Sequence, residues 1–271
     1  MAAVDTTVTR DTRARFPITE VRWSTVVAPL VLGALFLLSW EQLVDQAEIE
    51  PFILPAPSAI WEQVTANTGN IVDGATVTGR NALIGMLAGA VLGVVGAAIA
   101  GSFRFVDQMA APVVAALAVI PIVALAPVLY SMFGAAVNTG RIIVAGVSVA
   151  VPVYLNTLRG IRQVKAVHRD LMTAYAAGPL QRIRSVTLPT ATPYVFTGLR
   201  VASSLAVIAA LIAEYFGGPI GGLGKSITSS AASSNYPLAW AYVTGAIGLG
   251  LLFYVVTLLV ELWFSRHHQP A

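Results

Sequence analysis

The sequence predicts an all-α membrane protein with about six transmembrane helices. Of its 271 residues, 56% are hydrophobic and only 11% are charged, whereas an average soluble domain carries roughly 25% charged residues. The apolar residues gather in runs of about 20, the length that a helix needs to cross ~30 Å of hydrocarbon. The chain has no cysteine, so neither a disulfide nor a cysteine metal site is expected.

Six candidate spans follow one another along the chain. They cover residues 26–44, 80–100, 111–133, 141–158, 194–216 and 239–264. The chain therefore divides into an N-terminal tail (1–25), a transmembrane domain (26–264) that contains a polar loop at 159–193, and a C-terminal tail (265–271). The first span lacks a small-residue cleavage site, so we expect a retained helix and not a signal peptide.

The second span carries a row of small residues at helical spacing, namely Gly85, Gly89, Gly93 and Gly96. Rows of this kind let two helices approach closely in a bilayer. We expect this face to pack against another helix.

The third span is interrupted by Pro112, Pro121 and Pro127. Neighbouring helices can satisfy the carbonyl groups that a proline frees inside a membrane helix. Two interpretations remain open: ordinary packing, or kinks that place Pro121 and Pro127 along a substrate path.

Lysine and arginine gather in alternate loops, which sets the expected orientation. The first loop, residues 45–79, contains five acidic residues and no basic one. The basic residues of the 159–193 loop and the tails are Arg10, Arg13, Arg15, Arg22, Arg159, Arg162, Lys165, Arg169, Arg182, Arg184 and Arg266. We expect both termini and this loop in the cytoplasm. The pI near 9.4 follows from this topology, so no nucleic-acid partner is expected.

The basic loop contains the most informative stretch, DLMTAYAAGPLQRIRSVTLP at residues 170–189. A short amphipathic helix is predicted over residues 169–183. Leu188-Pro189 is expected to stop this helix and turn the chain back toward the bilayer. A polar helix of this kind between two spans indicates a docking site for a cytoplasmic partner.

This stretch resembles the coupling loop in the permease subunits of bacterial ABC importers, the binding-protein-dependent inner-membrane components. The family pattern is Glu-Ala-Ala, three residues, Gly, and a spacer that ends in Ile-x-Leu-Pro. Ala174 matches the second alanine, Gly178 the glycine and Leu188-Pro189 the terminal pair. The chain departs from the pattern at Met172, which replaces the glutamate, at Thr173, which replaces the first alanine, and in a shorter spacer.

Further segments resemble the nitrate, taurine and aliphatic-sulfonate branch of that family. FILPAPSAIWEQV (52–64) is similar to its external segment after the first helix, and PIVALAPVLYSMFG (121–134) to its third helix. LPTATPYVFTGLRVASSLAVIAALIAEYFGG (188–218) is similar to its fifth helix, and Gly222-Leu223-Gly224 matches a recurring Gly-Leu-Gly after it.

The resemblance implies an assembly in the bacterial plasma (inner) membrane: two permeases (a homo- or heterodimer), two ABC ATPase subunits and an extracytoplasmic substrate-binding protein. It implies no cofactor in this chain, with ATP and Mg held by the ATPase subunits. The sequence agrees in having no complete phosphate loop. The nearest segment, PIGGLGKS (219–226), begins with proline where glycine is required, and we interpret it as an external turn next to the binding protein.

The resemblance assigns ATPase coupling to one set of residues in the basic loop. Ala174 and Gly178 lie four residues apart and would share one face of the predicted helix. Arg182 and Arg184 would pair with acidic groups of the partner or with lipid headgroups, or serve the positive-inside topology alone. The set comprises Met172, Thr173, Ala174, Gly178, Arg182, Leu188 and Pro189.

Glu214 is the conspicuous acid within an apolar run. Ionisable groups are costly at membrane depth, but Glu214 is expected near the external end of its span, where water reaches it. Structural pairing or helix termination is the favoured interpretation, and a place on the substrate path with Pro121 and Pro127 is the alternative. Arg200, near the cytoplasmic end of the same span, is expected to snorkel to the interface.

No metal or catalytic site is predicted. His168, His267 and His268 have no carboxylate at ligand spacing. The serines of the last external loop are expected to line a polar vestibule, since no histidine lies on their side of the membrane; they are Ser229, Ser230, Ser233 and Ser234.

The sequence thus predicts a non-enzymatic permease subunit that imports a small anion such as a sulfonate, taurine or nitrate. The same class of importer carrying a pyrimidine vitamin precursor, riboflavin or an aromatic acid is the alternative. A secondary transporter driven by an ion gradient is more remote, because no convincing inverted repeat with broken helices is present.

Overall fold

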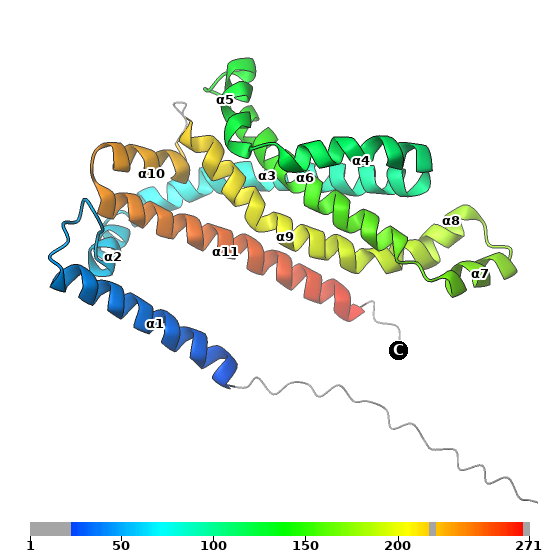
Figure 1. Ribbon diagram of the computed structural model, residues 1–271, viewed down its shortest axis with the longest axis horizontal. Coiled ribbons are helices and arrows are strands. Elements are labelled where there is room, and N and C mark those ends of the chain that lie inside the picture. The colour runs from blue at the N-terminus through cyan, green and yellow to red at the C-terminus, as the bar shows by residue number, and fades with distance from the viewer. Residues whose placement is uncertain (1–22, 217–220, 268–271) are drawn as a thin grey trace, which may run out of the picture. The chain divides into compact units, whose positions relative to one another are not determined.

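The computed structural model describes residues 23–216 and 221–267 (Figure 1). Most of the predicted N-terminal tail and the end of the C-terminal tail lie outside these residues. So do Gly218, which ends the segment 188–218, and the first two residues of PIGGLGKS. Every regular element in the described part is a helix, which confirms the predicted all-α class. The chain forms two units, residues 1–49 and 50–271.

The first unit contains α1 (Trp23–Gln46), which confirms the first predicted span. Its large apolar side chains are exposed around the helix, as Leu30, Leu32 and Phe36 show. A helix that is hydrophobic on all sides belongs in lipid or among other apolar helices.

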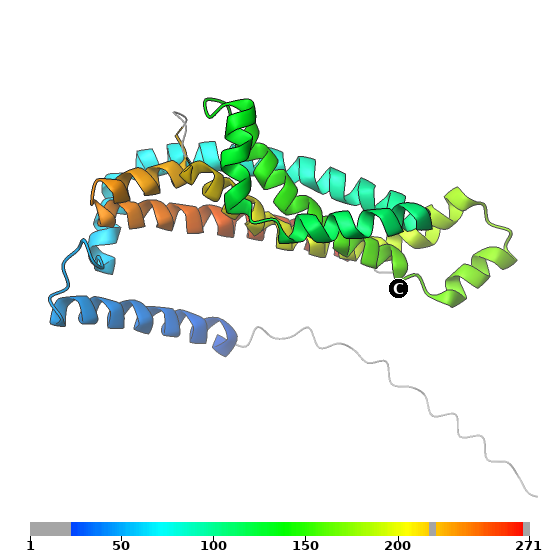
Figure 2. The same cartoon turned by 45° about the horizontal axis from the view of Figure 1, so that its top comes forward.

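The second unit contains four more spans at their predicted places, and the one predicted at 194–216 begins earlier, within the basic loop. α3 (Thr68–Ser102), α6 (Thr139–Arg162) and α11 (Tyr236–His267) each contain a predicted span, and α9 (Leu188–Tyr215) continues a helix that begins at Pro179. These four helices run side by side in both views (Figures 1 and 2). Short helices α2 (Pro57–Ala66) and α10 (Leu223–Ala232) lie at one end.

The row of glycines on α3 packs against α6, as predicted. A Cβ atom on Gly89 would lie 2.3 Å from the carbonyl oxygen of Gly146, and one on Gly93 would lie 2.7 Å from that of Ala150. No side chain fits at such distances, so the two backbones touch directly. This contact and the small side chains of α9 form the core of the unit, which includes Ala82, Val149, Val153, Ala202, Ala206 and Ala210.

The predicted third span is not one continuous helix. α4 (Arg104–Val119) and α5 (Ile122–Phe133) meet at 99°, and α5 turns away from the four long helices in both views (Figures 1 and 2). The break falls on Ile120 and Pro121, whose ψ angles of 122° and 114° are not helical. Proline disfavours the helical conformation in the residue before it and cannot donate to the ladder. Pro112 and Pro127, by contrast, lie inside helices.

Candidate functional site

The basic loop folds as two helices instead of the single predicted helix over residues 169–183. α7 (Ala166–Ala174) is followed by a turn, and α8 (Pro179–Arg182) begins after it. The turn contains Ala176 with φ of 48°, a conformation that a helix cannot contain and that non-glycine residues seldom adopt. Ala174 and Gly178 therefore lie on different helices and share no face. We call residues 166–187 the coupling segment.

Leu188-Pro189 does not stop the helix, contrary to the prediction. α8 passes through a π-helical turn, η1 (Ile183–Thr187), directly into α9, and Pro189 lies in the first turn of α9. Proline lacks the N–H and its ring clashes with the carbonyl four residues earlier. A π turn widens the ladder at that point, so the chain accommodates the proline without a break. The helix runs for 37 residues from Pro179 to Tyr215.

The outer surface of the coupling segment carries large exposed apolar side chains. Val167, Leu171 and Tyr175 recur at every fourth position and are 63%, 50% and 75% exposed, and Leu180 is 77% exposed. Contiguous exposed apolar side chains that alternate with charges mark a surface for a partner. The sequence pattern had placed the contact on small residues instead.

The predicted coupling residues are distributed over both helices. Thr173 and Ala174 are exposed at the end of α7, and Gly178 is the exposed N-cap of α8 with open space around its Cα. Leu188 and Pro189 lie exposed where α9 begins. Met172 and Arg182, by contrast, line a common cavity. The assignment of these residues to ATPase coupling stays a prediction.

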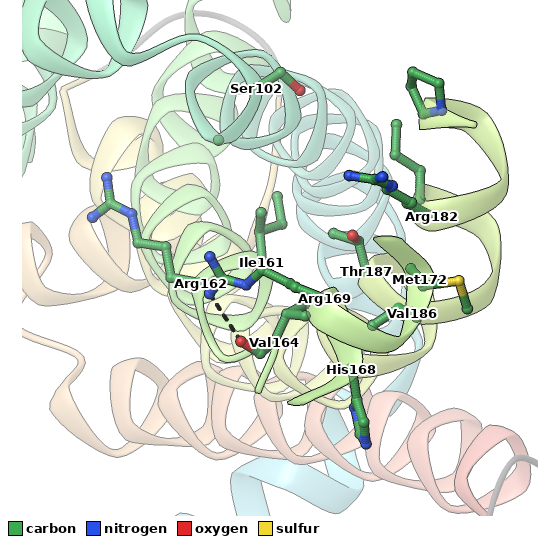
Figure 3. Close-up of a pocket in the computed structure, with 13 residues that line it drawn as sticks. Ser102, Ile161, Arg162, Val164, His168, Arg169, Met172, Arg182, Val186 and Thr187 are labelled. Carbon is green, nitrogen blue, oxygen red and sulfur yellow. Dashed lines mark hydrogen bonds between the residues drawn. The ribbon is translucent and has the colours of Figure 1, made fainter. Parts of the chain in front are cut away.

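This cavity, which we call the basic cavity, has a volume of about 610 Å³ and opens between the coupling segment and the ends of α3 and α6 (Figure 3). Four basic side chains and no acidic one line it: Arg162, His168, Arg169 and Arg182. Arg162 pairs with Asp107 of α4. Arg169 donates to the carbonyl oxygen of Val164 at 2.9 Å (Figure 3). Sequence reasoning missed the cavity because only the fold brings the end of α3 to the coupling segment.

A buried cluster of polar groups lies at the opposite end of α9. Glu214 is 0% exposed, so the expectation that water reaches it is wrong. Its Oε2 accepts a hydrogen bond from Thr78 Oγ1 of α3 and another from the Gly224 N–H of α10, both at 2.9 Å. Thr78 Oγ1 in turn accepts from the Leu223 N–H at 2.9 Å. These four residues form the Glu214 cluster, which joins three helices.

The Gly-Leu-Gly motif has a structural role in this cluster. A Cβ on Gly222, whose φ is +154°, would lie 2.5 Å from Glu214 Cδ, and one on Gly224 would lie 2.4 Å from the Leu211 carbonyl oxygen. Only glycine therefore lets this backbone close over the carboxylate. In a phosphate loop the backbone N–H groups bind phosphate. Here the Gly224 N–H instead donates to the Glu214 carboxylate of the same chain.

Arg141 is a buried residue that the sequence did not single out, since it lies at the edge of the predicted span 141–158. It lies in the first turn of α6 and is 0% exposed. Its Nη1 donates to the carbonyl oxygen of Gly221 at 3.3 Å. An arginine at the very start of an apolar run was the available signal.

The structure does not bring the predicted substrate-path residues into one site. Pro121 and Pro127 are exposed on the bent pair of helices, whereas Glu214 is enclosed. Arg200 does not snorkel alone, because its Nη1 lies 3.2 Å from Glu261 Oε2 on α11. Among the predicted vestibule serines, Ser230 is buried and Ser229, Ser233 and Ser234 are exposed.

Comparison with known proteins supplies the context for these two sites. The family described as "Binding-protein-dependent transport system inner membrane component" matches residues 85–269. The chain is 28% identical to the riboflavin transport system permease protein RibX of Chloroflexus aurantiacus, over 88% of this chain and 89% of that protein. It is 27% identical to the nitrate import permease protein NrtB of a Synechocystis strain, over 89% and 90%.

The fold is shared with a solved transporter structure. It is described as "Crystal structure of an amino acid ABC transporter with histidines", and it aligns with a TM-score of 0.61 at 14% identity, covering 73% of this chain and 95% of that one. At this identity the likeness shows the fold alone.

Proposed function

Because the chain belongs to the family of binding-protein-dependent transport system inner membrane components, we propose that it forms the translocation path of an ATP-driven importer. Separate ABC ATPase subunits hold ATP and Mg, a second permease completes the path, and an extracytoplasmic binding protein delivers the cargo. The observation that carries this proposal is the exposed apolar surface of the coupling segment, which is continuous with a membrane-spanning helix.

The continuous helix gives the coupling segment a mechanical connection to the other side of the membrane. A helix of 37 residues is about 55 Å long. When an ATPase subunit moves α8, the π turn and α9 move with it. At the far end, Glu214 holds the Gly224 N–H, so α10 follows α9. Movement of α8 would thus reach the far end of α9 without passing through a loop.

The proposed cargo is a small anion such as nitrate, taurine or another sulfonate. The family branch and the similarity to a nitrate permease support this cargo. The similarity to a riboflavin permease supports the alternative, an aromatic or heterocyclic organic cargo such as riboflavin, a pyrimidine vitamin precursor or an aromatic acid.

A pull-down of the tagged chain from native membranes tests the assembly. We expect mass spectrometry to identify an ATPase together with a second permease, or an ATPase alone if the permease is a homodimer. A Leu171→Asp/Tyr175→Asp variant serves as the control, because it places charge on the proposed docking surface and should lose the ATPase. A chain that is isolated alone and still supports uptake would instead identify a gradient-driven carrier. The co-purified binding protein is then screened against nitrate, taurine and riboflavin.

The absence of cysteine permits a direct test of orientation. Tyr175→Cys in the coupling segment and Ser233→Cys after α10 introduce single thiols at exposed positions. A membrane-impermeant maleimide added to spheroplasts should label the second variant at once and the first only after lysis. The reverse order would place the coupling segment outside and overturn the proposal.

A further inference from the structure

We propose that the basic cavity binds the headgroup of an anionic phospholipid from the cytoplasmic leaflet. The proposal goes beyond the transport function and rests on it only for the cytoplasmic placement of the coupling segment. Its experimental test therefore measures ATPase binding and lipid binding separately.

The charges of the cavity favour an anion. Arg169 and Arg182 line it from α7 and α8 (Figure 3), with no acidic residue in the lining. Each is held in place by one hydrogen bond to a backbone carbonyl, Val164 for Arg169 and Ala177 for Arg182, both at 2.9 Å. A guanidinium carries five N–H donors, so each arginine is oriented and keeps further donors for phosphate oxygens. Asp107 pairs with Arg162 and largely neutralises its charge. Arg169 and Arg182 therefore supply the positive charge of the cavity.

The rest of the lining is apolar, which favours a lipid over a free anion. Ile161, Met172, Ile183 and Val186 contribute hydrocarbon surface beside the arginines. Inorganic phosphate gains nothing from such surface, whereas the glycerol and the first methylenes of a phospholipid bury apolar area against it.

The position of the cavity relative to the bilayer fits a headgroup. Gly101 and Ser102, at the end of α3, form part of its wall. α3 has 35 residues and is about 52 Å long, which exceeds the ~30 Å of hydrocarbon and reaches through the headgroup layer. Basic pockets between helix ends on the cytoplasmic side meet the anionic lipids of that leaflet.

The basic cavity and the apolar docking surface use different faces of α7. His168, Arg169 and Met172 line the cavity, whereas Val167 and Leu171 belong to the exposed apolar surface. At 100° per residue the centres of these two faces are well separated around the helix. An ATPase on the outer face therefore leaves the cavity to lipid, and this separation favours a lipid over an acidic segment of the partner protein.

A bound headgroup would join the two halves of the coupling segment. It would contact Arg169 before the turn at Ala176 and Arg182 after it, and so restrain α7 against α8. Anionic lipid would then make the transmission of ATPase movement to α9 stiffer.

Native mass spectrometry of the full chain with its co-purified partners tests the proposal. The protein is exchanged into detergent with phosphatidylglycerol or phosphatidylethanolamine. We expect the native chain to retain phosphatidylglycerol in preference, and Arg169→Gln/Arg182→Gln to bind it roughly tenfold or more weakly. Arg159→Gln/Arg184→Gln is the matched control, since it removes two exposed charges outside the cavity and should keep the preference.

The possible results distinguish a lipid headgroup from free phosphate, and they test the lipid proposal separately from the transport proposal. Equal lipid retention by both double variants, or displacement of phosphatidylglycerol by millimolar inorganic phosphate, would overturn the lipid site. Loss of the bound lipid when the ATPase is present would show that the cavity belongs to the partner protein, and would also overturn it. Recovery of the ATPase in the same samples reports on the transport proposal independently.

Discussion

The two ends of the helix from Pro179 to Tyr215 are opposite in character. At the coupling end, Leu180 is 77% exposed and an open basic cavity lies behind it. At the other end, Glu214 is fully enclosed and its Oε2 bonds to Thr78 and Gly224 of the same chain. The carboxylate at one end is enclosed and bonded within the same chain, whereas the other end presents exposed apolar side chains that fit a partner. The difference argues that Glu214 holds the structure together and that the coupling segment carries the intermolecular contact.

The largest stability effect is expected at the enclosed end. Glu214→Ala removes the acceptor of two buried hydrogen bonds, from Thr78 Oγ1 and from the Gly224 N–H. Leaving a buried donor unpaired typically costs about 1–3 kcal/mol, so the loss of two partners should exceed the effect of any other change considered below. Thermal unfolding of the purified chain in detergent measures the loss.

Glu214→Gln is the control for this prediction, because it keeps the volume and one carbonyl acceptor and should lose less stability than the alanine variant. If the glutamine variant unfolds like the native chain but no longer supports uptake, Glu214 acts on the substrate path and the comparison between the two ends fails.

Two glycines give the next largest effect: Gly224 of α10, which packs against the Glu214 end of this helix, and Gly178, the N-cap at its coupling end. Gly224→Ala puts a Cβ 2.4 Å from the Leu211 carbonyl oxygen and 2.8 Å from Glu214 Cβ, and overpacking of this kind costs about 1–3 kcal/mol. Gly178→Ala meets nothing within 4 Å and should change stability by less than about 0.5 kcal/mol. Unfolding temperatures of the two variants, measured side by side, test this difference in packing between the two positions. Equal losses would mean that the coupling end is packed as tightly as the Glu214 cluster.

The sequence predicted the positions of the helices more reliably than the contacts between them. Gly89 belongs to a row of glycines that predicts close helix packing in a bilayer, and α6 indeed packs against it. The Glu214 cluster was beyond reach, because Thr78 and Glu214 are 136 positions apart and no local pattern joins them. The burial of Arg141 was missed for the same reason. Pro121 and Pro189 show the limit of local rules: one proline breaks its helix and the other is absorbed by a π turn, according to what surrounds it.

An intermediate effect is expected between the two ends, where Arg200 pairs with Glu261. Both side chains are partly exposed, 31% and 16%, and such pairs contribute about 1 kcal/mol or less. Arg200→Gln should lower the unfolding temperature slightly. A double-mutant cycle with Glu261→Gln isolates the pair: additive losses would show that α9 and α11 are held by apolar packing alone.

Gly178→Asp is expected to have the smallest effect on stability and the largest effect on ATP-driven uptake. Gly178 is the N-cap of α8, with φ of −68° and ψ of 164°, and aspartate is among the best residues at that position. The variant should therefore insert and fold normally. Its negative charge would lie on the surface proposed to contact the ATPase, so ATP hydrolysis should no longer drive uptake in reconstituted vesicles. Gly178→Ser is the matched control, since serine caps equally well without a charge and should keep coupling. Normal transport by the aspartate variant would mean that the ATPase docks elsewhere, on α7 alone; failure of both variants would point to a need for glycine itself at the contact.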